Sequence, residues 1–251
     1  MEAWFTQHRG QPDYSQQDAL LLAGDVFQSP DLPVSSATIS EDVALLAVAD
    51  GVSGSPAADR ASRIILELIA AASHSRIGLV DAKLIREACE TFRERLARGR
   101  TYGAATTLAL LHIHGRSAAV VNCGDSRVYR IRDGEWRQLS KDHTMLAELK
   151  ACGELGDVDP SDVASIYKGL AHCIVADPIE ANVRIHSRVV DIHAGDIVLI
   201  TTDGIHETLD GGRLQNLYDP ALPLPAQIDR WRDAVFAAGA PDNFSLIALK
   251  R

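Results

Sequence analysis

The chain lacks the excess of basic residues that a protein for polyanions would carry. Its 251 residues contain 25 lysines and arginines against 34 aspartates and glutamates, so the formal net charge is −9. A protein whose main partner is a nucleic acid or an anionic membrane needs a basic footprint to neutralise phosphate groups. The balance therefore argues against both partners. It leaves open whether the excess acid is spread over the surface or concentrated at one place.

Paired cysteines and long apolar runs are also missing. No two of the four cysteines are spaced as a CxxC pair, which is typical of a reduced cytosolic protein. The N-terminus has no basic segment followed by an apolar run, as a signal peptide would have. No apolar stretch approaches the roughly 20 residues that a membrane helix requires. We therefore expect a cytoplasmic protein with no membrane partner.

Low-complexity tracts, internal repeats and interdomain linkers are absent as well. A chain of this size buries about 70–75% of the surface that it exposes when unfolded, so one apolar core is sufficient for stability. We expect a single domain over residues 1–251.

Apolar runs and turn signals predict an α+β fold with an antiparallel core. Two buried strands are predicted, Val43–Ala49 before Asp50-Gly51 and Ile197–Thr202 before Asp203-Gly204. Ser55 is the expected N-cap of the first helix, with Pro56 at its first position. The predicted helices are Ala57–Ala72, Val80–Arg98, His143–Cys152 and Pro225–Ala238, and the predicted hairpins join Thr106–Ile113 to Ser117–Asn122 and Arg127–Arg132 to Glu135–Leu139.

Several aspartates share a position beside a predicted strand or an apolar run. These residues are Asp18, Asp50, Asp125, Asp203 and Asp242. The glycine after two of them allows close approach of the backbone, whose carbonyl can then serve as a ligand. Oxygen ligands of this kind suit the hard ions Mg²⁺ and Mn²⁺. A single Asp-Gly pair is an ordinary turn, so the set and its order carry the inference.

Six motifs in a fixed order make the chain similar to the PPM-type phosphatases, the metal-dependent family also called protein phosphatase 2C. The motifs are Asp50-Gly51 with Gly54, Gly103–Thr107, Asn122–Arg127, Lys141–Thr144, Thr202–Gly204 and Pro241–Asn243. They resemble the bacterial branch, and the resemblance runs from about Arg9 to the end. It implies a four-layer α-β-β-α sandwich of two antiparallel sheets flanked by helices.

The resemblance also implies a metal site of two to three Mn²⁺ or Mg²⁺ ions. Asp50, Asp203 and Asp242 would bind the first ion and act in catalysis through a metal-activated water. Asp50 would bridge to the second ion, which also takes the Gly51 carbonyl.

Further ligands are implied in the same way. Asp18, with Gln17 before it, would hold the second ion through water. Asp125 would hold a third ion together with Asp203, and Asp162 is our candidate for completing that third site. His143 and His206 are candidates for roles behind the ligands.

The activity implied is hydrolysis of phosphoserine and phosphothreonine in proteins. Hydroxide formed on the metal ions would attack phosphorus in line while the ions offset charge on the phosphoryl oxygens. The expected partners are phosphorylated proteins and a cognate serine/threonine kinase, with no nucleic acid.

The sequence departs from the family pattern at the N-terminal edge of the site. The usual phosphate-binding arginine, five residues before Asp18, is Asp13 here. Either Arg9 replaces it, or the site depends on its metal ions alone. Gln17 stands where a glutamate is usual. Val52 stands where some members have a histidine proposed as general acid, a role left to a metal-bound water or to His143.

These departures leave two alternatives open. The chain could be a phosphopeptide-binding regulator with weak or no turnover, or a phosphatase for a small metabolite on the same fold. A basic run is open to two interpretations: a solvated helix face, which we favour, or a docking patch for acidic phosphopeptides. It consists of Arg93, Arg95, Arg98 and Arg100.

Overall fold

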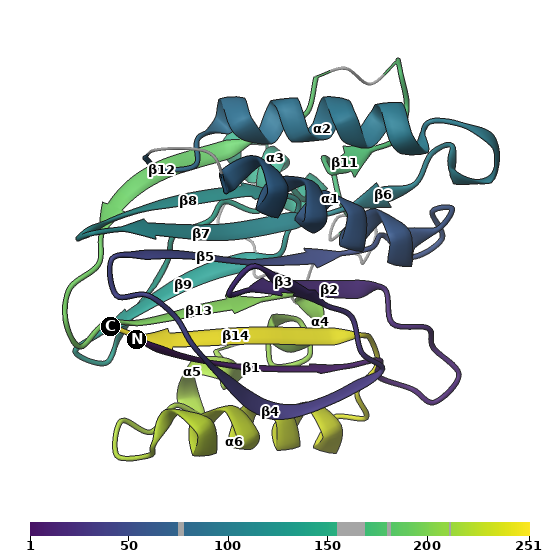
Figure 1. Cartoon of the computed structure of the whole chain (residues 1–251). Helices are drawn as coiled ribbons and strands as arrows, with labels where there is room; N and C mark the ends of the chain where they lie inside the picture. Colours follow the sequence, from purple (N-terminus) through teal and green to yellow (C-terminus); the bar gives the residue numbers. More distant parts are fainter. Residues whose placement is uncertain (75–77, 155–168, 180–181, 211) are drawn as a thin grey trace.

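Two six-stranded antiparallel sheets pack face to face, and helices cover both outer faces (Figure 1). This computed structural model describes residues 1–74, 78–154, 169–179, 182–210 and 212–251. The first sheet has the order β10-β9-β13-β14-β1-β4, and the second has the order β12-β8-β7-β5-β2-β3. Figure 1 therefore shows the four layers that the family resemblance implies, and the predicted α-β-β-α fold is confirmed.

The strands of the first sheet are β1 (Glu2–His8), β4 (Asp31–Thr38), β9 (Arg127–Arg132), β10 (Glu135–Gln138), β13 (Ile197–Thr201) and β14 (Phe244–Lys250). Those of the second are β2 (Asp18–Leu22), β3 (Asp25–Phe27), β5 (Val43–Asp50), β7 (Leu108–His114), β8 (Ser117–Cys123) and β12 (His186–Asp191). A short pair joins β6 (Ala105–Thr106) to β11 (Ile174–Val175).

The helices are α1 (Ala58–Ser73), α2 (Ala82–Leu96), α3 (Met145–Ala151), α4 (Asp203–His206), α5 (Arg213–Asn216) and α6 (Leu224–Ala237), with a 3-10 turn η1 (Gly99–Thr101) after α2. Helices α1 and α2 lie over the second sheet, and α6 lies under the first (Figure 1). None of the described helices is long and apolar enough to cross a membrane.

Apolar side chains on both faces of each sheet hold the layers together. In β2 every residue is buried. Leu21 packs toward the cluster that includes Phe92 of α2, while Leu20 and Leu22 pack toward the other sheet. Alternation along a strand explains this, because successive side chains point to opposite faces. A third cluster, centred on fully buried Trp231, joins α6 to the first sheet.

Both predicted hairpins are present. Asp133 and Gly134 have φ of 52° and 80°, which is the backbone that a tight turn between twisted strands requires. The prediction for the start of the first helix is wrong. Helix α1 begins at Ala58 after Ala57 in the left-handed region, with no side-chain cap. The Ser55 hydroxyl instead accepts a hydrogen bond from the Ala105 N–H at 3.1 Å.

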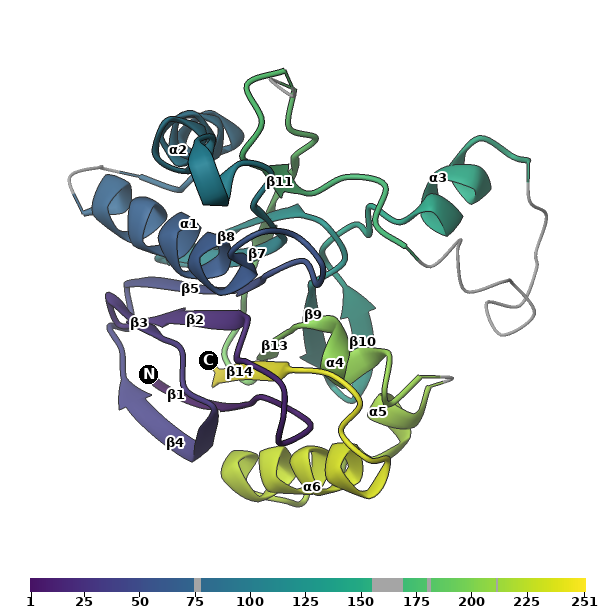
Figure 2. The ribbon, with the colours of Figure 1, turned by 90° about the vertical axis from the view of Figure 1, so that its right-hand side faces the viewer.

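The topology brings several chain ends together. At one end of the sandwich, on the right in Figure 1, strands β5 and β8 end, while β2, β14 and α4 begin. Figure 2 looks onto this end. The aspartates predicted to bind metal lie on or beside these segments. Antiparallel pairing within each sheet, together with the packing of the two sheets, therefore collects acid that is dispersed along the chain.

Candidate metal centre

Strand pairing places the first two aspartates opposite each other. Asp18, at the start of β2, is the register partner of Asp50, at the end of β5. Asp203 opens α4 directly after β13, and it interacts electrostatically with both of them. Asp242, in the loop before β14, interacts with Asp18 and Asp203. Asp125 follows β8 and interacts with Asp50 and Asp203. All five predicted aspartates therefore meet at one end of the sandwich.

Asp18 is completely buried and only half satisfied. Its Oδ2 accepts hydrogen bonds from the Thr202 and Ser245 hydroxyls, both at 2.8 Å, while its Oδ1 is buried without a partner among the described residues. Burial raises the pKa of Asp18 to about 7, with smaller contributions from Asp203 and Asp242, although the two hydroxyl bonds lower it. Near neutral pH the apo protein therefore holds this group close to its titration midpoint.

Asp50 and Asp203 form a coupled pair. Burial, followed by the charge of Asp203, raises the pKa of Asp50 well above its usual value. Burial, followed by Asp242, raises the pKa of Asp203 to about 6. The interaction between the two carboxyls raises the pKa of Asp50 and lowers that of Asp203. Oδ1 of Asp203 is buried and has no hydrogen-bond partner among the residues described.

Asp125 and Asp242 differ in exposure. Asp125 is 7% exposed, and burial, then Asp203 and Glu207, raise its pKa well above the usual value. Asp242 is exposed, and partial burial of its carboxyl group raises its pKa. The hydrogen bond that this carboxylate accepts from the Asn243 N–H at 2.8 Å lowers the pKa and so opposes that effect. The cluster thus runs from a buried interior to an open edge.

Two glycines make the close approach of these segments possible. A Cβ on Gly51 would lie 2.3 Å from the Ala58 carbonyl oxygen, and one on Gly204 would lie 1.9 Å from the Asn243 carbonyl oxygen. Both distances are impossible for a real side chain, so the Asp-Gly pairs are required by packing. Gly51 also forms a bridge with Thr106, and its N–H donates to the Gln17 carbonyl at 3.1 Å.

Threonines of the Gly103–Thr107 motif fix the backbone of Asp50. The Asp50 N–H donates to the Thr107 hydroxyl at 3.0 Å, and the Asp50 carbonyl accepts from the Thr106 hydroxyl at 2.9 Å and the Thr107 N–H at 2.8 Å. The Thr107 hydroxyl also contacts the Ser126 hydroxyl at 2.7 Å, beside Asp125. This motif therefore positions carboxylates and supplies none itself.

Asn243 ties the N-terminal segment to the site. Its Oδ1 accepts a hydrogen bond from the Gln17 N–H at 2.7 Å, and its Nδ2 donates to the Arg9 carbonyl at 2.6 Å. This bond places the Arg9 backbone beside Asp242. The guanidinium of Arg9 makes no hydrogen bond or ion pair within the described part of the chain.

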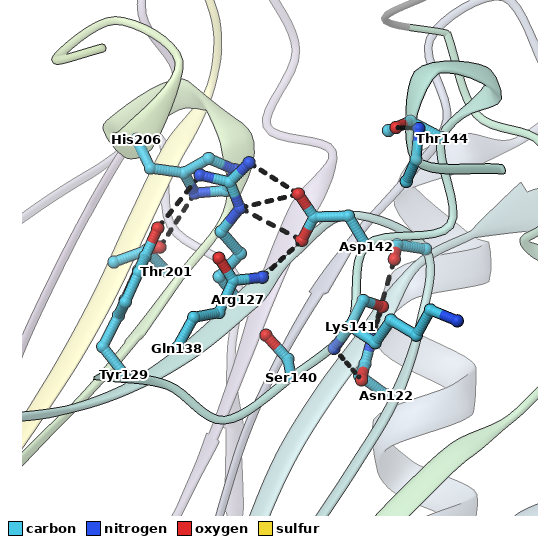
Figure 3. A network of polar contacts seen from close by, with 12 residues as sticks. Asn122, Arg127, Tyr129, Gln138, Ser140, Lys141, Asp142, Thr144, Thr201 and His206 are labelled. Carbon is cyan, nitrogen blue, oxygen red and sulfur yellow. Dashed lines mark hydrogen bonds and ion pairs between the residues drawn. The ribbon is translucent and has the colours of Figure 1, made fainter. Parts of the chain in front are cut away.

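The Asn122–Arg127 and Lys141–Thr144 motifs hold each other (Figure 3). Asn122 donates to the Lys141 carbonyl at 2.8 Å and accepts from the Lys141 N–H at 3.0 Å. Arg127 donates to both oxygens of Asp142, the closest contact being 2.6 Å. Arg127 is half-buried, and the bidentate carboxylate satisfies its guanidinium. The two motifs therefore clamp the loop that carries Asp125.

The two candidate histidines are buried and their pKa values are low. His143 Nδ1 accepts a hydrogen bond from the Gly124 N–H at 3.1 Å, and burial, then His172, lower its pKa to about 4. His206 Nδ1 contacts the Thr201 hydroxyl at 3.0 Å, next to Arg127 in Figure 3. Burial, then Arg127, lower its pKa well below the usual value. His143 is neutral near pH 7, so it supports the Gly124 loop there rather than carrying a proton as a cation.

Other predicted positions lie at the edge of the site or outside the description. Asp13 is exposed in the segment between β1 and β2. Asp162 falls within residues 155–168, outside the described residues. Sequence reasoning missed the roles of three side chains. Thr202 and Ser245 bind Asp18, and Asn243 binds the backbone of Gln17 and Arg9. Their signal was available, since each lies within or beside a quoted motif.

The donor set fits hard divalent ions, although the described side chains are not arranged around one. No three His, Cys, Asp or Glu side chains in the described ranges are placed to hold a metal ion as they stand. However, Asp18 and Asp203 each keep a buried oxygen without a hydrogen bond among the described residues. Neighbouring carboxylates and burial raise the pKa values of both, and a divalent cation relieves that cost. These two oxygens are therefore available to a bound cation or to its water molecules.

Comparison with known proteins identifies the family. The family model described as "Protein phosphatase 2C" matches residues 34–235. The chain is 24% identical over 260 residues to the serine/threonine phosphatase Stp of Listeria welshimeri, covering 100% of this chain and 96% of the relative. The chain belongs to the protein phosphatase 2C family. Its recognition as a metal-dependent, PPM-type protein phosphatase of the bacterial branch is thereby confirmed.

Solved structures share the fold. The serine/threonine phosphatase PstP/Ppp of Mycobacterium tuberculosis superposes with a TM-score of 0.77 at 20% identity, with 100% of both chains covered. The catalytic domain of a serine/threonine phosphatase PstP in complex with 2 manganese ions gives 0.72 at 21% identity, covering 99% of this chain and 98% of that one.

Proposed function

We propose that this chain hydrolyses phosphoserine and phosphothreonine in proteins, with two to three Mn²⁺ or Mg²⁺ ions bound. The observation that carries the proposal is the convergence of Asp18, Asp50, Asp125, Asp203 and Asp242 at one end of the sandwich. Burial raises the pKa values of all five, and neighbouring carboxylates raise those of the first four further. Membership of the family and the names of the relatives support phosphoprotein substrates. A solved neighbour that contains manganese supports the choice of metal.

Each aspartate has a proposed place in the site. Asp50, Asp203 and Asp242 would hold the first ion. Asp50 and the Gly51 carbonyl would hold the second, with Asp18 and Gln17 binding its water molecules. Asp125 and Asp203 would hold a third.

The chain's own residues prepare the site for catalysis. Bound divalent ions supply a hydroxide near neutral pH and offset negative charge on the phosphoryl group. Thr106 and Thr107 fix the backbone of Asp50, and Thr202 and Ser245 orient Asp18. Arg9 has no described side-chain partner, so its guanidinium is free to contact the substrate phosphate at the edge of the site.

The decisive experiment is metal-dependent turnover of a phosphothreonine peptide. We expect phosphate release with Mn²⁺, loss with EDTA, and loss of at least 100-fold in Asp50→Asn and Asp203→Asn, since each removes a charged ligand. Asp42→Asn is the control, because Asp42 is exposed in the turn before β5, at the far end of the sheet. Full activity in Asp50→Asn would refute the metal mechanism.

The same assay separates the alternatives. A phosphopeptide-binding regulator would bind the peptide with no turnover in Mn²⁺. A small-metabolite phosphatase would have a higher kcat/KM on small phosphate esters than on phosphopeptides. We further propose a cytoplasmic location and a cognate serine/threonine kinase, which copurification of the two proteins would test.

A further inference from the structure

The basic run at the end of α2 divides into a buried and an exposed part. Arg93 is partly buried, whereas Arg95, Arg98 and Arg100 are exposed. The Arg98 Nε donates to the Arg95 carbonyl at 3.1 Å, so the chain folds back on the last turn of the helix. We call the three exposed residues the arginine ridge. None of them forms an ion pair with a described residue, although acidic residues outnumber basic ones, 34 to 25.

The arginine ridge lies at the same end of the sandwich as the carboxylates. The chain after α2 reaches the end where β5 stops, as both ribbon views show (Figures 1 and 2). It continues directly into the motif that fixes Asp50. The Ala105 carbonyl accepts from the Val52 N–H at 3.0 Å, which joins this segment to the loop after Asp50. The ridge and the metal centre therefore share one end of the sandwich.

Exposed apolar side chains adjoin the arginine ridge. Tyr102 is 46% exposed and Ile179 is 87% exposed. Asp177 links the two segments, because it raises the pKa of the nearby Tyr102 hydroxyl and its Oδ1 accepts a hydrogen bond from the Ile179 N–H at 2.9 Å. The Gly103 N–H also donates to the Ala176 carbonyl at 3.0 Å. Basic and apolar contacts are thus presented together on one supported surface.

We propose that the arginine ridge binds acidic residues next to the phosphorylated residue of the substrate protein, with Tyr102 and Ile179 contacting its apolar side chains. This inference rests on the proposed function and adds the class of substrate. An acidic segment would otherwise be repelled by a chain of net charge −9 and by the carboxylates of the site. Unpaired arginines beside the site attract that segment and favour it over a basic one.

The test uses two phosphothreonine peptides that differ only in their flanks, one with Asp and Glu and the other with Asn and Gln. We expect the natural chain to have the higher kcat/KM on the acidic peptide. Combining Arg95→Glu, Arg98→Glu and Arg100→Glu should reduce kcat/KM on that peptide by about tenfold or more, since each exposed ion pair contributes roughly two- to threefold. The loss should be in KM and should shrink as salt is added.

Two controls isolate the arginine ridge. The triple variant should keep its activity on an aryl phosphate whose aryl group is uncharged, because this small ester has no flanking residues. Arg116→Glu changes the charge of an exposed arginine in the turn between β7 and β8, at the opposite end of the sheet, and should leave the peptide preference unchanged.

Several results would overturn the inference. An equal acidic preference in the natural chain and the triple variant would do so, and so would an equal loss in Arg116→Glu. If the triple variant loses binding to single-stranded DNA or to phosphatidylserine vesicles but keeps the acidic-peptide preference, the arginine ridge serves another partner. If the natural chain lacks turnover with Mn²⁺, the proposed function fails by itself. The arginine ridge is then judged by anisotropy of the two labelled peptides, where loss of acidic-peptide binding in the triple variant still supports it.

Discussion

Asp18 and Asp50 are direct register partners across β2 and β5. Two acids opposite each other on neighbouring strands destabilise a sheet, and here one of them is completely buried. The Thr202 and Ser245 hydroxyls satisfy only one oxygen of Asp18. The arrangement therefore costs stability in the apo chain, and bound cations are the natural compensation.

The first prediction is that Asp18→Asn stabilises the apo chain at alkaline pH. The pKa of Asp18 is raised to about 7 in the folded state, so its ionisation opposes folding as the pH rises from about 4 to above 7. An amide removes that cost and still accepts from both hydroxyls. In EDTA we expect urea unfolding at pH 8 to show a gain on the order of 2–4 kcal/mol, vanishing near pH 4.

Manganese provides the matched comparison for this variant. With Mn²⁺ present, the natural chain should gain thermal stability and Asp18→Asn should gain less, because one negative charge beside the ions is missing. An equal Mn²⁺ shift in both chains would exclude Asp18 from the metal site.

The second prediction concerns Asn243, which is bonded to the backbone of Gln17 and Arg9. Asn243→Ala removes both hydrogen bonds from a buried position, so unfolding should be easier by about 2–3 kcal/mol. Activity should fall further than stability explains, with kcat/KM on a phosphopeptide about tenfold lower or more, because a small displacement of catalytic groups is costly.

A matched control separates stability from activity. Gln227 is another buried amide that joins two backbone groups, Asp219 N–H at 2.8 Å and Leu217 carbonyl at 3.1 Å. It lies on α6, on the outer face of the first sheet (Figure 1). Gln227→Ala should lower stability by a similar amount and leave kcat/KM unchanged. Equal activity losses in the two variants would show that Asn243 has no positioning role.

The acidic site could be predicted from the sequence because each main ligand candidate follows an apolar run or precedes one. Asp50-Gly51 and Asp203-Gly204 mark strand ends by local pattern alone. The bonds that orient these groups could not be predicted in this way. Thr202 reaches Asp18 across 184 positions, and Asn243 reaches Gln17 across 226. Only the face-to-face packing of the two sheets brings such residues together.

Strand β1 shows why part of the fold was also missed. Thr6 and Gln7 are fully buried although they are polar, so the segment lacks the apolar alternation of a strand. Their partners are remote: Thr6 donates to the Leu32 carbonyl, and Gln7 donates to the Asp18 carbonyl and the Ser245 hydroxyl. Tertiary hydrogen bonds thus replace the hydrophobic signal on which a sequence-based prediction depends.

The third prediction is a pH dependence of stability that originates at His143. Its pKa is lowered to about 4 in the folded chain, against about 6.5 when unfolded. As the pH falls, this histidine is therefore protonated in the unfolded chain before it is protonated in the folded chain. The folded chain loses stability as the pH falls from 6.5 toward 4. His143→Asn keeps an acceptor for the Gly124 N–H and should remove about 3 kcal/mol of that loss in urea titrations. A profile unaffected by His143→Asn would contradict the assignment.

The fourth prediction is that Asp13→Arg lowers KM for phosphopeptides. Asp13 is exposed in the segment between Arg9 and Gln17, which Asn243 fixes at both ends beside Asp242. A guanidinium there would add a bidentate phosphate contact and remove a repelling charge, so KM should fall about threefold to tenfold. The kcat should change little, because the carboxylates are untouched.

Asp13→Asn separates the loss of the negative charge from the gain of the arginine. Asp25→Arg makes the same charge change at the exposed start of β3, beside the far end of β2, and should leave KM unchanged. An unaltered KM in Asp13→Arg would mean that Arg9 already supplies the phosphate contact, and Arg9→Ala should then raise KM in the natural chain.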